Sequence, residues 1–126
     1  MIDAGNLLSP AQEAALSQRL GAFEARTRHR VLIATVPSLE GRKLDDAVEE
    51  IGNRFGLHDG VVMLVAVRER KVRVAVGRGA MKLITNSEAQ RIVSRHMVPD
   101  LHANRFDQGI LKGADRIMAE LSETVG

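Results

Sequence analysis

Two neighbouring stretches of hydrophobic residues predict the centre of a β-sheet. Residues 61–67 form a continuous apolar run, which is typical of a strand covered on both faces. A polar break follows, and residues 71–76 then alternate, with Val72, Val74 and Val76 on one face. Two strand-like runs this close predict a hairpin whose second strand lies at or near a sheet edge.

The outer ends of this hairpin give the candidate functional site. A hairpin brings its two ends together, so Asp59 and Gly60 should lie beside Gly77, Arg78 and Gly79. One carboxylate and two glycine turns would then share one end of the sheet. Arg30 and Arg78 should be near neighbours of Asp59, because the strands bearing them start or end there, and that end looks more cationic than acidic.

Helical periodicity predicts the covering layers. Ser9 and Gln12 form a capping box around Pro10, and an apolar stripe then continues to about Thr27. Residues 31–36 read as a second inner strand, and residues 44–55 carry apolar residues at helical spacing. A strand, a helix and a strand in succession predict a right-handed crossover between parallel strands.

The second half of the chain continues with helices. Thr85 and Glu88 form another capping box, and the helix that they open should end before Pro99. Apolar spacing from Phe106 to Leu121 predicts a last helix, in which Gly109 and Gly113 permit a close approach of another backbone. Residues 1–8 stay undecided between turn and other structure.

These elements predict one α/β domain over residues 1–126, a three-layer α/β/α sandwich with helices on both faces of a small mixed β-sheet. The strand over residues 31–36 should run parallel to the 61–67 strand, and residues 71–76 antiparallel to it. The predicted core residues are Leu16, Leu20, Ile33, Val48, Ile51, Val62, Leu64, Val74, Ile110 and Ile117.

Composition narrows the function classes. Aromatic residues make up 2% of the chain and all are Phe, which argues against base-stacking nucleic-acid modules. The net charge of +2 is too small to imply DNA or a membrane surface. Cysteine is absent, which excludes a disulfide or a thiolate metal site. The sequence shows no apolar run of bilayer-spanning length and no signal peptide.

An ordered set of motifs resembles the TPM domain. The set begins with Ile-Asp-Ala-Gly at residue 2, Leu-Ser-Pro at residue 8 and Thr-Val-Pro-Ser-Leu-Glu-Gly-Arg at residue 35. It continues with Asp-Gly-Val-Val-Met-Leu at residue 59, Arg-Lys-Val-Arg-Val-Ala-Val-Gly-Arg-Gly at residue 70, and the glycine pair of the last helix. The resemblance implies an α/β/α sandwich. It also implies a periplasmic or membrane-tethered extracytoplasmic location, since most such proteins belong to the bacterial envelope or the thylakoid lumen.

The resemblance implies three kinds of activity described for different family members: acid phosphatase, calcium binding, and service as an adaptor for membrane complexes. The chain departs from the family pattern at two acidic positions, which are His58 and Asn86 here. The implied metal set is therefore Asp59, Asp3 and Asn86. With so few carboxylates, we expect Ca²⁺ to bind weakly or not at all.

Each candidate residue also has a purely structural explanation. Asp59 can be a ligand, a catalytic carboxylate or a turn residue before Gly60. Residues 77–79 can cradle an anion on backbone N–H groups or form a tight strand exit. Arg73 can contact a ligand or protect a sheet edge from pairing. Asn86 can supply an oxygen or lie in an ordinary helix start.

The sequence thus leads to two main hypotheses. The first is a non-catalytic binding or adaptor domain of the envelope, with a protein partner, a small anion as a further candidate ligand, and no cofactor. Its ligand site would comprise Asp59, Gly60, Arg73, Gly77, Arg78, Gly79 and Asn86. The alternative is a cation-dependent, acid phosphatase-like hydrolase that uses Ca²⁺ or Mg²⁺ and Asp59 at the same site. A nucleic-acid binder is a third and weaker option, with only the mildly basic balance behind it.

Overall fold

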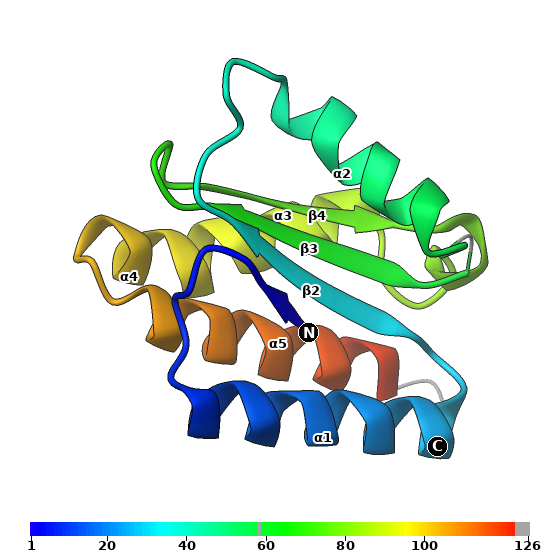
Figure 1. Ribbon diagram of the computed structural model, residues 1–126. Helices are drawn as coiled ribbons and strands as arrows, with labels where there is room; N and C mark the ends of the chain where they lie inside the picture. The colour runs from blue at the N-terminus through cyan, green and yellow to red at the C-terminus, as the bar shows by residue number, and fades with distance from the viewer. Residues whose placement is uncertain (58, 123–126) are drawn as a thin grey trace.

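The computed structural model describes residues 1–57 and 59–122, and it has three layers (Figure 1). The central sheet has the strand order β1-β2-β3-β4, with β1 (Ile2–Asp3), β2 (Val31–Val36), β3 (Val61–Ala66) and β4 (Lys71–Val76). β1, β2 and β3 are parallel, and β4 is antiparallel to β3. The predicted three-layer fold, mixed sheet and hairpin are confirmed.

Helices cover both faces of this sheet. The helix α2 (Leu44–Arg54) lies alone on one face. The other face carries α1 (Pro10–Thr27), α5 (Phe106–Ser122) and a helical segment made of α3 (Asn86–Ile92), η2 (Val93–Met97) and α4 (Val98–His102). A short 3-10 turn, η1 (Arg78–Ala80), leads out of β4.

The predicted helix starts are present in detail. Ser9 accepts a hydrogen bond from the Gln12 N–H at 3.1 Å, and the Gln12 side chain accepts one from the Ser9 N–H at 3.0 Å. Thr85 and Glu88 make the same reciprocal pair at the start of α3. Each box satisfies two backbone donors that a helix start leaves without an intrahelical partner.

The α-helix that Thr85 and Glu88 open ends at Ile92, before Pro99 as predicted, but the helical path continues beyond it, which was not predicted. Residues 93–97 form a π-helical turn, in which the Val98 N–H donates to the Val93 carbonyl, and α4 begins directly afterwards. Proline has no N–H to donate and is tolerated in the first turn of a helix. Pro99 lies in the first turn of α4, so the wider turn before it lets the helical path continue.

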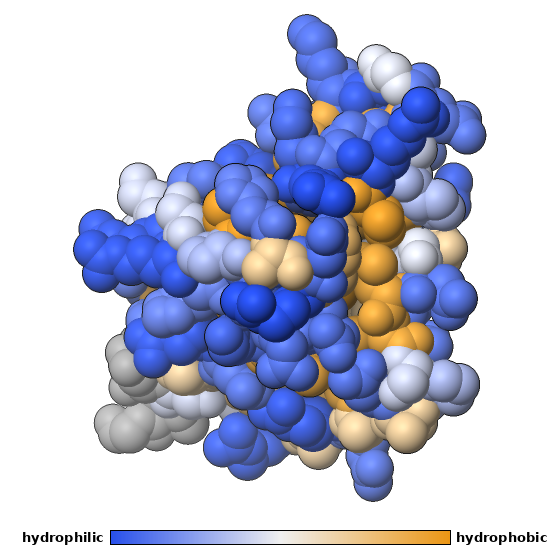
Figure 2. Space-filling view, turned by 90° about the vertical axis from the view of Figure 1, so that its left-hand side faces the viewer, coloured by the Kyte–Doolittle hydropathy of each residue, from blue (hydrophilic) through white to orange (hydrophobic). Residues whose placement is uncertain are grey.

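The undecided N-terminal residues form the edge strand β1. Its two residues pair only with Ala34 and Thr35 of β2. Apolar surface gathers on the right of Figure 2, the side that faces the viewer in Figure 1. A hollow of about 290 Å³ lies between β1, β2 and α2, lined among others by Ile2, Val36 and Phe55.

The two crossover connections have opposite hands. β1 to β2 and β2 to β3 step in the same direction across the sheet, yet α1 packs on one face and α2 on the other. Only one of the two can therefore be right-handed, although right-handed connections dominate in proteins.

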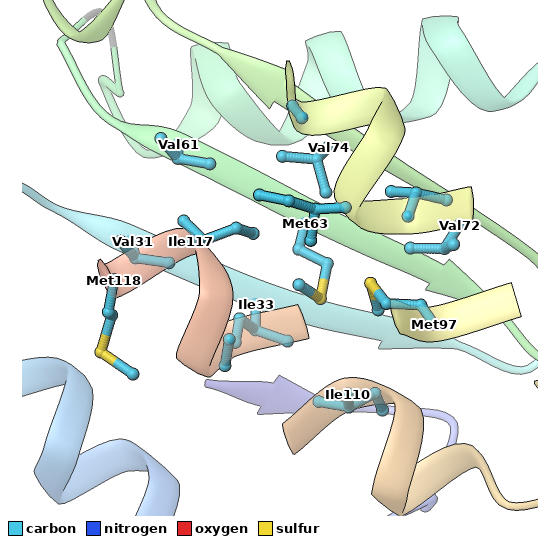
Figure 3. Packing of buried hydrophobic residues seen from close by; sticks show 14 of the residues in the cluster. Val31, Ile33, Val61, Met63, Val72, Val74, Met97, Ile110, Ile117 and Met118 are labelled. Atoms are coloured by element: carbon cyan, nitrogen blue, oxygen red, sulfur yellow. The ribbon is translucent and has the colours of Figure 1, made fainter. Parts of the chain in front are cut away.

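The core is divided between the two faces of the sheet, as the continuous apolar pattern of β3 predicts. Val61 and Met63 of β3 point toward the α1 and α5 side, together with Ile33 of β2 and Val74 of β4 (Figure 3). Val62 and Leu64 point the other way, toward α2. Every residue of β3 is buried.

Nine of the ten predicted core residues are buried, and the exception is Ile51. Ile51 is half-buried on α2 and packs at the border of the smaller cluster. One helix alone covers that face, so the outer row of its apolar stripe has no further layer above it.

Candidate functional site

The two ends of the β3–β4 hairpin meet where the sequence predicts. The Gly77 N–H donates to the Gly60 carbonyl at 2.7 Å, and the Val61 N–H donates to the Arg30 carbonyl at 2.9 Å. Gly60 has no room for a side chain, because a β-carbon there would lie 2.6 Å from the Arg30 carbonyl oxygen. Backbone contacts therefore fix this end of the sheet.

Asp59 lies over the turn that leaves β4. A β-carbon built on Gly79 would be 2.7 Å from the Asp59 carboxyl carbon and 2.8 Å from its β-carbon. Such contacts are far inside van der Waals distance. Gly79 is therefore required by the close approach of the Asp59 side chain, and the carboxylate and the turn form one unit.

A hollow of about 530 Å³ opens beside this unit, between the C-terminal half of α2 and the ends of β3 and β4. We call it the sheet-end hollow. Its polar lining includes Asp59 and Arg78 from the predicted site and Glu49 and Asn53 from α2. Val62 and Ala75 contribute to its apolar floor.

Sequence reasoning missed Glu49 and Asn53. They are four residues apart, so they lie on the same side of α2, next to its apolar stripe. That spacing, combined with the predicted position of the helix end near the start of β3, is the signal that could have found them. With Glu49 and Asp59 against Arg78, the lining is not mainly cationic, so the expected cationic character was wrong for this hollow.

The backbone carbonyl of Arg30 lies at the site, where it accepts the Val61 N–H, but the side chain of Arg30 makes its contacts elsewhere. Its guanidinium donates to the Phe55 carbonyl at 3.2 Å and lies 3.6 Å from a carboxylate oxygen of Glu24. Arg30 thus joins the ends of α1 and α2, and it does not line the sheet-end hollow.

Arg73 is on the α2 face of the sheet but away from the hollow. Its Nε atom lies 3.2 Å from the Asp45 carboxylate, at an angle unsuited to a hydrogen bond. It pairs in register with Leu64, in the middle of β3. The structure therefore does not bring Arg73 together with Asp59.

Asp3 lies at the opposite end of the sheet from Asp59, so the two do not form the joint metal site considered from the sequence. Asp3 is in register with Thr35, which pairs with Val65. Asp59 precedes Val65 by six residue steps, or roughly 20 Å at about 3.3 Å per step.

The Asp3 carboxylate is used by its own surroundings. It accepts hydrogen bonds from the Thr35 hydroxyl at 2.5 Å and from the N–H groups of Leu7 and Leu8, each at 2.9 Å. Burial raises the pKa of Asp3, but these hydrogen bonds outweigh it and hold the pKa below its ordinary value. Asp3 therefore stabilises the turn between β1 and α1.

Asn86 does not join Asp59 in the sheet-end hollow. It is the exposed first residue of α3, which packs on the face opposite α2, and it does not line the sheet-end hollow. His58, the remaining residue at which the chain departs from the family pattern, lies outside the described residues. Asp59, Gly77 and Arg78 are thus the predicted residues that line the hollow, with Gly60 and Gly79 directly behind them.

Two absences concern the described residues, 1–57 and 59–122. These residues contain no cluster of three or more His, Asp or Glu side chains arranged to hold a metal ion. None of the described helices combines the length and apolar character needed to span a bilayer.

Comparison with known proteins places the whole chain in context. The family model for the TPM domain matches residues 1–120. The N-terminal domain of a protein from P. gingivalis, solved by NMR, superimposes with a TM-score of 0.92 at 23% identity. That match covers 98% of this chain and 82% of the other.

Two further NMR structures share the fold. The BA42 protein of the psychrophilic bacterium Bizionia argentinensis has a TM-score of 0.76 at 15% identity, over 92% of this chain and 82% of its own. The N-terminal domain of the cg2496 protein from Corynebacterium glutamicum has a TM-score of 0.76 at 13% identity, over 99% and 81%. The comparison with curated proteins gave no match.

Proposed function

The chain belongs to the TPM domain family, and from this premise we propose that it is a non-catalytic binding domain of the bacterial envelope, an adaptor whose ligand site is the sheet-end hollow. The location would be periplasmic or tethered to the outer side of a membrane. The ligand would be a segment of a partner protein.

One observation carries this proposal: the hollow combines charges of both signs on a rigid frame. Asp59 and Glu49 offer carboxylates, Arg78 offers a guanidinium, and Val62 and Ala75 offer apolar contact. A site of this kind suits a peptide segment with a basic side chain directed at the carboxylates and a carbonyl or carboxylate directed at Arg78. The frame is the hairpin end, fixed by the hydrogen bond from Gly77 to Gly60.

Site-specific photo-crosslinking in cells tests the proposal. A photoreactive residue at Asn53, on the α2 side of the hollow, should give a protein adduct in the envelope fraction. The same residue at Gln18, on the exposed side of α1, is the matched control. The Asn53 adduct should disappear when Asp59→Ala or Arg78→Ala is added. If neither substitution changes the adducts, the partner binds outside the sheet-end hollow and the proposal is contradicted.

A phosphatase-like hydrolase is the second candidate. The matching family model carries the word phosphatase in its name, and Asp59 and Glu49 place two carboxylates in one hollow. Asp59 would then act as the catalytic carboxylate, with Ca²⁺ or Mg²⁺ as a cofactor. Hydrolysis of an aryl phosphate, assayed with each cation and with chelator, separates the two functions. If the protein hydrolyses the phosphate only with a cation, and Asp59→Ala abolishes this hydrolysis, the hydrolase replaces the adaptor as the proposed function.

The proposed adaptor has no resident cofactor, and Ca²⁺ should bind it weakly or not at all. Ca²⁺ takes six to eight oxygen ligands, and its affinity rises with the number of carboxylates. Asp3 lies at the opposite end of the sheet from Asp59, Asn86 does not line the hollow, and Arg78 would oppose a divalent cation there. Calorimetric titration checks this, since saturation at micromolar Ca²⁺ with amide shifts around Asp59 would contradict it.

A further inference from the structure

A second hollow, of about 190 Å³, lies between α5 and the continuous helical segment α3–η2, away from the sheet-end hollow. Arg91, Arg95 and His96 line it from the α3–η2 side, and Arg116 and Glu120 line it from α5. We call it the arginine hollow. Three guanidinium groups on two separate helices thus surround one small depression.

The helical path through α3 and η2 places Arg91 and Arg95 on the exposed side of the helix, facing the arginine hollow. Arg91 and Arg95 are one turn apart, so both project from the same side of the helix. Arg95 and His96 belong to the π-helical turn η2. Such turns are rare and occur frequently at functional sites. Here the turn puts Met97 inside against Gly113 while Arg95 remains on the exposed side.

The arginines of this hollow are not engaged elsewhere. Within residues 1–57 and 59–122, the ion pairs shorter than 4.0 Å include none with Arg91, Arg95 or Arg116. All three are exposed. A free guanidinium is suited to paired hydrogen bonds with a planar or tetrahedral oxyanion.

Two glutamates border the hollow and reduce its charge without cancelling it. Glu88 is held by the helix start, where its carboxylate accepts the Thr85 N–H at 3.1 Å. Glu120 lies four residues after Arg116, an order less favourable for an ion pair along a helix than the reverse. Three guanidinium groups against two carboxylates leave a positive balance.

We propose that the arginine hollow is a binding site for a phosphate-class oxyanion, contacted by Arg91, Arg95 and Arg116. The size of the hollow fits this class. Drug-sized ligands and cofactors occupy sites of about 300–1,000 Å³, whereas one water accounts for about 30 Å³ of liquid. A volume of about 190 Å³ therefore suits a phosphate group with its nearest substituent. The same group can come from a soluble phosphate ester or from an anionic lipid headgroup.

Amide and arginine side-chain NMR during titration with inorganic phosphate and with phenyl phosphate tests the site at low ionic strength. Saturable shifts should centre on Arg91, Arg95 and Arg116. Arg95→Gln and Arg116→Gln should each weaken binding about tenfold, the effect of losing one charge-assisted hydrogen bond. Glu120→Gln should strengthen binding. Arg54→Gln, which changes an exposed arginine on α2, is the matched control and should leave it unchanged.

Vesicles distinguish the two sources of the phosphate group. If the source is a lipid, the domain should cosediment with phosphatidylglycerol vesicles, not with phosphatidylcholine vesicles, and Arg95→Gln should abolish this. If the source is soluble, the phosphates should saturate the site without vesicle binding. The proposal is overturned if phosphate shifts centre on residues 77–79 or are absent, with no Arg95-dependent vesicle binding. Circular dichroism of each variant verifies that it is folded.

Discussion

The carboxyl group of Asp59 occupies the space that a β-carbon on Gly79 would need, with 2.7 Å between that position and the carboxyl carbon. Asp59 precedes β3 and Gly79 follows β4, so both lie at the open end of the β3–β4 hairpin, and the contact joins them across the sheet end. The position of the candidate ligand group therefore depends on a residue that has no side chain of its own.

Gly79→Ala should displace the Asp59 carboxylate and weaken whatever the sheet-end hollow binds. The overlap resembles overpacking, which costs about 1–3 kcal/mol in free energy of unfolding. Gly21→Ala is the control, because a β-carbon there meets nothing within 4 Å in the middle of α1. That change should stabilise the domain by up to about 1 kcal/mol. Urea denaturation measures both, and equal effects would contradict the assigned contact.

The buried carboxylate of Asp100 should make stability fall in acid. Lys112 donates to Asp100 at 2.8 Å and Arg105 at 2.9 Å. The hydrogen bond from Lys112, together with that from Arg105, outweighs burial and holds the pKa of Asp100 below its ordinary value. A lowered folded-state pKa adds stability above the unfolded-state pKa, and this is lost as the pH falls through the folded-state value.

We therefore expect the urea midpoint to decline below about pH 4, the ordinary range of an aspartate. Asp100→Asn should lower stability at neutral pH and flatten this decline. Lys112→Gln should flatten it too, because it removes the main cause of the shift. Identical pH profiles for the three proteins would show that Asp100 does not contribute.

The hydroxyl group of Thr35 should contribute more to the free energy of unfolding than its methyl group does. It is fully buried, donates to Asp3 and accepts the Gly5 N–H at 2.9 Å. Thr35→Val keeps the shape but leaves the Gly5 N–H without its partner, which costs about 1–3 kcal/mol for a buried group, and it removes one of the hydrogen bonds that Asp3 accepts. Thr35→Ser retains the hydroxyl and should cost less. Thermal unfolding compares them, and a larger loss in the serine variant would contradict the assignment.

Met97 and Gly113 should be energetically coupled. A β-carbon on Gly113 would lie 2.5 Å from the Met97 sulfur, so Gly113→Ala should cost about 1–3 kcal/mol. Met97→Ala should cost about 2–5 kcal/mol, but the double variant should cost less than the sum, because each change relieves the other.

Gly109 provides the control for this cycle. Its β-carbon would lie 3.2 Å from the Met97 carbonyl oxygen, which is backbone. Trimming the Met97 side chain should therefore not relieve Gly109→Ala. Equal coupling of both glycines to Met97 would contradict the assigned contacts.

Local patterns were sufficient to predict most of the fold. The capping boxes at Ser9 and Thr85 act over three residues, so the sequence shows both partners side by side. The continuous apolar run of β3 and the alternation of β4 predicted one covered and one edge strand, and both are present. The meeting of Asp59 with residues 77–79 followed from the hairpin alone.

The features that were missed depend on contacts between distant parts of the chain. β1 has two residues and no periodicity, and it is fixed by pairing with a strand some thirty residues later. Glu49 and Asn53 line the site because α2 packs against β3 and β4, which are distant from it in the chain. Pro99 is accommodated by a π-helical turn that its own neighbourhood does not predict.

The pairing pattern of the sheet implies that local opening is rare in the central strand β3 and frequent in the edge strand β1. All six residues of β3 pair with β2 on one side and with β4 on the other, and every one is buried. Its amide hydrogens should exchange with solvent only when the whole domain unfolds, whereas those of β1 should exchange through local fraying. Because the sheet-end hollow is built at the entry to β3, its frame belongs to the slowest-exchanging part of the molecule, and a ligand there would meet a surface that is already ordered.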